Sequence, residues 1–154
     1  MKWIQKKGVV VYENSEAKRR MTEYIVPVGA VFPELIKKLS AVYVYKIGEQ
    51  GGDAREVDGI CWRDETSDVG TLFAIGISLE TLDEGPEYTQ FVFLHELAHM
   101  ATGENHNVKF HEELDKMIRT YNQATGASLE NDYFDIPSRF DCRPYKIGGT
   151  IRKM

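Results

Sequence analysis

All four histidines of this 154-residue chain fall between positions 95 and 111: His95, His99, His106 and His111. His95 and His99 are four residues apart, so on a helix their imidazoles project from one face and can reach a single metal ion. Glu96 is rotated by about 100° from His95 on such a helix, where it can hold a water molecule beside the ion rather than bind the ion. The spacing therefore predicts a metal site that activates water.

H-E-x-x-H is the pattern of zinc peptidases, so we expect one Zn2+ ion with His95 and His99 as ligands and Glu96 as the general base. A catalytic zinc usually has three protein ligands and one open position. His106 follows His99 by seven residues, and Gly103 between them can end the helix and turn the chain back. His106 is therefore the expected third ligand.

Other residues are candidates for parts of the same site. His111 and Tyr133 are candidates for a side chain that contacts the substrate or donates a hydrogen bond to the oxyanion, and His111 could equally lie at the surface. A Cys142 thiolate could block an open zinc position. Four side chains are alternatives to His106 as third ligand: His111, Glu112, Glu113 and Glu130.

HELAH, a short glycine-containing turn and then HNVKF make residues 70–121 resemble the SprT-like and WLM metallopeptidases. Members of these families show H-E-x-x-H, a connection of variable length, and then His-x-x-x-Phe at the start of the next helix. His106 and Phe110 fill these two positions. The resemblance implies a zincin-like peptidase domain in which His95, His99 and His106 hold zinc.

The implied activity is hydrolysis of peptide bonds in a protein or peptide substrate through a zinc-bound water, with Glu96 as its general base. The alternative is a zincin-fold module that binds zinc and acts in regulation or with nucleic acid, without peptidase activity. The two families are associated with cleaving proteins on DNA. DNA is not favoured as a partner here because the net charge is −5, although residues 1–20 and 137–154 are basic.

The helix that carries H-E-x-x-H is predicted from Pro86 at its first position to Gly103 at its end. It is apolar almost all round, so we expect it to be buried. A second helix follows it and ends at Gly126, with one apolar stripe that anchors it to the core and holds His106 near the first helix. The stripe consists of Phe110, Leu114, Met117 and Tyr121.

Strands are predicted at 8–12, 41–47, 57–63 and 70–79, and further helices from Ser15 to Ile25 and at 31–39. In 70–79, bulky residues alternate with small ones. We expect this strand to be the sheet edge along which an extended substrate lies. The small face would then contact the substrate, although close packing of a helix would explain it equally well. The small residues are Ala74, Gly76 and Ser78.

These elements predict an α+β fold, a zincin-like single domain over 1–154 with a small mixed sheet packed against the H-E-x-x-H helix. Its core spans about 20–126, and the sequence does not predict how the tail 127–154 packs. No apolar run approaches the ~18 residues of a membrane helix, so we expect a cytoplasmic protein without a membrane partner. Cys61 and Cys142 are expected to be ordinary thiols, and the oligomeric state is not predicted.

Overall fold

The computed structural model describes residues 11–47, 58–64, 72–104, 106–131 and 151–153. Its helices are α1 (Ser15–Val31), α2 (Pro33–Ile36), α3 (Leu79–Asp83), α4 (Pro86–Thr102) and α5 (Val108–Thr125). Its strands are β1 (Leu39–Tyr45), β2 (Gly59–Asp64), β3 (Leu72–Ser78) and β4 (Ile151–Lys153). The predicted α+β class with a small mixed sheet is confirmed. None of the helices in these ranges is long and apolar enough to cross a membrane.

The sheet has the strand order β1-β3-β2-β4. β1 and β3 are parallel, whereas β2 runs antiparallel to both of its neighbours, β3 and β4. Every residue of β3 from Phe73 to Ile77 has one partner on β2 and another on β1. β3 is therefore an interior strand of the sheet.

The predicted edge strand is thus wrong, because the backbone of β3 already pairs on both sides. Contacts within the protein explain why these positions of β3 carry small residues. A Cβ atom on Gly76 would lie 2.5 Å from Cζ of Tyr43, so the glycine makes room for the ring of its cross-strand neighbour. The Ser78 hydroxyl caps α3 by accepting from Thr81 N at 3.0 Å, and Ala74 is fully buried.

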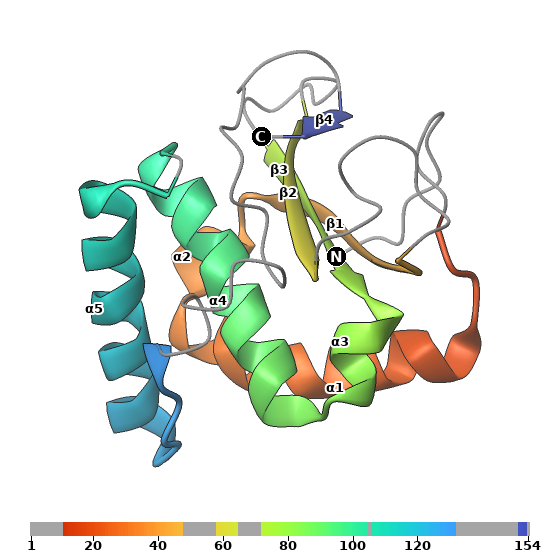
Figure 1. Ribbon diagram of the computed structural model, residues 1–154, viewed down its shortest axis with the longest axis horizontal. Helices are drawn as coiled ribbons and strands as arrows, with labels where there is room; N and C mark the ends of the chain where they lie inside the picture. The colour runs from red at the N-terminus through yellow and green to blue at the C-terminus, as the bar shows by residue number, and fades with distance from the viewer. Residues whose placement is uncertain (1–10, 48–57, 65–71, 105, 132–150, 154) are drawn as a thin grey trace.

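The helices cover one face of the sheet, and α4 lies between α5 and the strands (Figure 1). Bulky residues of β1 and β3 pack with α1, α4 and α5 in one apolar core. The small face of β3 belongs to a second cluster on the opposite side. Its members are Val11, Ala41, Tyr43, Tyr45, Ile60 and Ala74. None of these residues belongs to a helix, so packing against a helix of the described ranges does not explain the small face.

The helix predicted at 31–39 is present only as the short helix α2, Pro33–Ile36. α1 extends through Pro27 to Val31, and Phe32 then leaves the helical conformation with φ −123° and ψ 57°. A residue that precedes proline is disfavoured in the α region, and Pro33 follows Phe32 directly. Only a single turn remains as α2, and β1 begins at Leu39.

The other expected elements agree with the structure in part. The strands predicted at 41–47 and 57–63 correspond to β1 and β2, shifted by up to two residues at each end. Residues 8–10 lie outside the described ranges. Val11 and Tyr12 are not in a strand, although Tyr12 N donates to Val44 O at 2.7 Å.

Candidate metal centre

α4 begins and ends where its capping residues predict. Pro86 occupies the first turn, and Gly103 takes the left-handed conformation, φ 67°, directly after the last helical residue. The helix is buried on almost every side, as expected from its apolar sequence. His95, Glu96 and His99 are 1%, 2% and 0% exposed. Burying such polar side chains costs free energy unless a partner satisfies them.

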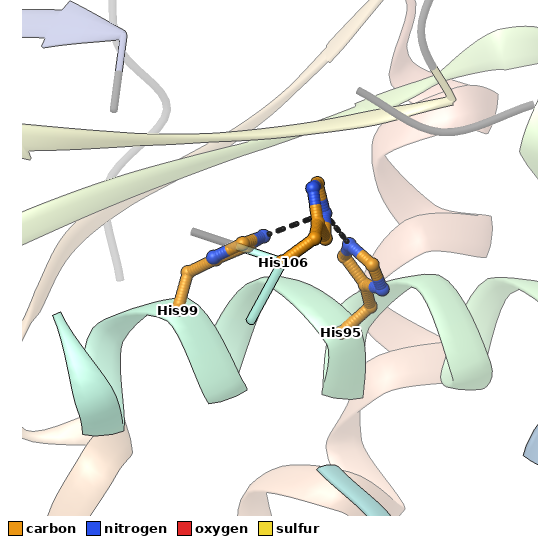
Figure 2. Close-up of side chains that lie close together, drawn as sticks. All are labelled: His95, His99 and His106. Carbon is orange, nitrogen blue, oxygen red and sulfur yellow. Dashed lines mark hydrogen bonds between the residues drawn. The ribbon is translucent and has the colours of Figure 1, made fainter. Parts of the chain in front are cut away.

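The structure brings His95, His99 and His106 together (Figure 2). Nε2 of His106 lies 3.0 Å from Nε2 of His95 and 3.3 Å from Nε2 of His99. In tetrahedral coordination with Zn–N bonds of about 2.0–2.1 Å, ligand nitrogens are about 3.3–3.4 Å apart. The spacing of these nitrogen atoms therefore fits a shared ion.

Burial keeps the three imidazoles neutral. It lowers the pKa of His95 well below its ordinary value, and the neighbouring histidines lower it further. Burial and the charge of His106 lower the pKa of His99 to about 3, and burial together with His111 lowers the pKa of His106 to about 4. Because only a neutral imidazole offers a lone pair to a metal, the cluster is in its ligand form near neutral pH.

A backbone carbonyl fixes the orientation of the His99 ring. Nδ1 of His99 lies 2.8 Å from the carbonyl oxygen of Glu104. A carbonyl only accepts hydrogen bonds, so Nδ1 carries the proton and Nε2 keeps its lone pair toward the cluster. Gly103 makes this possible, because its left-handed conformation turns the chain so that Glu104 returns past the helix end.

α5 delivers the third imidazole. Asn107 caps this helix, with its side-chain oxygen accepting from Phe110 N at 3.0 Å, and His106 immediately precedes the cap. The predicted apolar stripe of α5 is buried, and Gly126 ends the helix with φ 76°. This packing holds His106 against α4, as the sequence predicted.

The side chain of Glu96 extends from α4 toward β2. A Cβ atom on Gly59, the first residue of β2, would be 3.0 Å from Oε2 of Glu96 and 2.6 Å from Cγ1 of Val92. Glycine is therefore required for this close approach of strand and helix. Sequence reasoning missed Gly59, and its one signal was a glycine inside the strand pattern VDGICWR.

His111 lies beside the cluster but does not converge with its ligand atoms. The ring of His111 is 6.4 Å from that of His106, centroid to centroid, and roughly stacked on it. Within the described ranges, one group of side chains converges closely enough for a metal, and its members are His95, His99 and His106. The proposed alternative ligands are not among them: His111, Glu112, Glu113 and Glu130.

Two candidates lie outside the described residues, namely Tyr133 and Cys142. Most of the basic residues in 1–20 and 137–154 do so as well. Cys61 is fully buried on β2, where burial and then the charge of Glu96 raise the pKa of its thiol. Cys61 therefore stays protonated near neutral pH, as expected for an ordinary thiol.

Comparison of the chain with known protein families, curated proteins and solved structures finds no match. The candidate metal centre is therefore defined by its own geometry.

Proposed function

We propose that the chain is a zinc-dependent metallopeptidase with a zincin-like fold. The observation that carries this proposal is the convergence of three neutral imidazoles beside Glu96. Two of them, His95 and His99, are fully buried on the same helix as Glu96, and His106 is partly buried. Three nitrogen ligands are the donor set of catalytic zinc sites, which keep one position open, whereas structural sites usually have four protein ligands.

His95, His99 and His106 would hold the ion. Zinc there would supply Lewis-acid chemistry, polarising an amide carbonyl and lowering the pKa of water. Glu96 would accept a proton from the attacking water and donate it to the leaving amine nitrogen. The close approach of Gly59 confines the Glu96 carboxylate to the space between α4 and β2, which supports a fixed position for this proton transfer.

An extended substrate would pair with β2 rather than with β3. β2 is the strand that approaches Glu96, at Gly59. Its pairing with β4 involves Trp62–Asp64, so the end of β2 nearest Glu96 lies beyond that ladder. Main-chain pairing to a strand is a common mode of peptide binding, and here it would bring the peptide backbone close to the general base.

Replacing Glu96 by glutamine tests the proposal. Glu96→Gln keeps the size of the side chain and removes its basicity. We expect cleavage of a broad peptide library by zinc-loaded protein to fall by at least about 10²-fold, with zinc content unchanged. Equal cleavage by the variant and the wild type would contradict a catalytic role for Glu96, and the zinc measurement shows that the site itself is intact.

The burial of the cluster favours a second candidate, a zinc-binding regulatory module without peptidase activity. His95, Glu96 and His99 are nearly inaccessible to solvent, as in many structural sites. For such a module, zinc would stabilise the fold and Glu96→Gln would leave its biological effect unchanged. Zinc binding without cleavage of any library peptide, in wild type and variant alike, would favour this candidate.

A further inference from the structure

The ring of Phe110 contacts all three imidazoles of the candidate metal centre. Its centroid is 4.2 Å from that of His99, with the planes nearly stacked, and 4.9 and 5.1 Å from those of His95 and His106, edge to face. Phe110 is fully buried. Both stacked and edge-to-face arrangements are favourable for aromatic pairs, so each contact restrains an imidazole in its own orientation.

These contacts act on the torsion that decides whether a metal can bind. Rotation of an imidazole about its χ2 bond costs little energy. A small rotation moves Nε2 away from the position at which all three nitrogen atoms can bind one ion. His99 is restrained by its hydrogen bond to Glu104 as well, whereas the Phe110 contact is common to all three rings. The ligands come from α4 and from the residue before the α5 cap, and Phe110 on α5 contacts both.

We propose that Phe110 is a positioning residue for the metal centre, whose ring holds the three imidazoles in their convergent orientation before the ion binds. The inference rests on the metal site of the proposed function and not on peptidase activity. Removing the ring lowers metal affinity because the imidazoles then lose orientation entropy on binding, as expected for residues that orient metal ligands.

A matched pair of variants separates this role from ordinary core packing. Phe110→Leu removes the ring at the metal centre. Phe93→Leu makes the same change on α4, at an equally buried site of the same core. In the described part of the chain no ring contact joins Phe93 to an imidazole. Both variants should lose stability against urea in the metal-free form, because both remove core volume.

The deciding measurement is the Kd for Zn2+, obtained by competition with a chromophoric chelator. We expect Phe110→Leu to raise it by about 10- to 100-fold and Phe93→Leu to leave it within about twofold of wild type. Co2+ in the same site should show a changed visible absorption spectrum in the Phe110 variant alone. Phe110→Met serves as a second ringless variant should Phe110→Leu fail to fold.

Equal zinc affinities in the Phe110 and Phe93 variants would overturn the proposal, whether both are lowered or neither is. A wild-type protein that binds no zinc would overturn it together with the proposed function. Loss of affinity in the Phe110 variants, combined with unchanged cleavage in Glu96→Gln, would support the positioning role while removing the peptidase proposal.

Discussion

The three imidazoles differ in how the chain holds them. His99 is fixed by the carbonyl of Glu104, just past the glycine that ends α4. His106 arrives from the residue before the α5 cap, so its position depends on the packing of that helix. His95 is buried in the middle of α4. The three imidazoles therefore converge only when α4, the turn after it and α5 are all in their native positions.

The lowered histidine pKa values predict the pH dependence of the metal-free protein. In the folded chain the pKa of His99 is about 3 and that of His106 about 4, against an ordinary value of 6.5. Below pH 6.5 the unfolded chain therefore binds protons that the folded chain does not. The free energy of unfolding should fall as the pH is lowered from about 7 to 4, by up to about 1.4 kcal/mol per pH unit for each histidine.

Urea unfolding of chelator-treated protein across this range checks the slope. His99→Asn is the control, because asparagine keeps an amide donor toward Glu104 but does not titrate. In this variant the free energy of unfolding should change less steeply with pH, by the contribution of about one proton. An identical slope in the variant and the wild type would show that His99 is not held neutral by burial.

A buried polar cluster joins the elements that flank the site. The Tyr88 hydroxyl on α4 donates to Oδ2 of Asp58 at 2.6 Å. The Asp58 carbonyl accepts from Ser78 N at 3.0 Å and from the Thr81 hydroxyl at 3.1 Å. Asp58 directly precedes Gly59, so these bonds fix the start of β2 against α3 and α4 at the point where Glu96 approaches the strand.

The contact of β2 with α4 predicts a coupled effect of two substitutions. Gly59→Ala should lower the free energy of unfolding by roughly 1–3 kcal/mol, because its methyl group would overlap Val92. Val92→Ala creates space at the same point. The double variant should therefore be more stable than the sum of the two single effects by at least about 0.5 kcal/mol. Urea unfolding of the four proteins measures this coupling, and additive effects would contradict the close contact.

Across the whole molecule, features that depend on neighbouring residues, such as helix ends, could be predicted from the sequence better than contacts between distant segments. The ends of α4 and α5 depend on Pro86, Gly103 and Gly126, and each acts on its own helix. Convergence of His106 with the other two imidazoles followed from the stripe that anchors α5. Helix and strand type could therefore be predicted around the site from sequence.

Strand order could not be predicted in the same way. β3 pairs with β1, more than thirty residues earlier in the chain, and with β2 on its other side, and no local pattern encodes which strands lie inside. The role of Gly59 likewise depends on a contact with α4, more than thirty residues later in the chain. The alternation of β3 was visible in the sequence, but the ring of Tyr43 that explains Gly76 comes from another strand.

Metal analysis of three proteins shows whether His95, His99 and His106 together hold a zinc ion. Wild type, His106→Ala and His111→Ala are compared after zinc loading and removal of excess metal. The two histidines lie on either side of the α5 cap, but only His106 has a nitrogen within 3.3 Å of both other imidazoles. We predict one zinc per chain in the wild type and in His111→Ala, and a loss of most zinc in His106→Ala. Full zinc content in His106→Ala would show that His106 is not a ligand, and no zinc in the wild type would show that the three histidines do not form a zinc site.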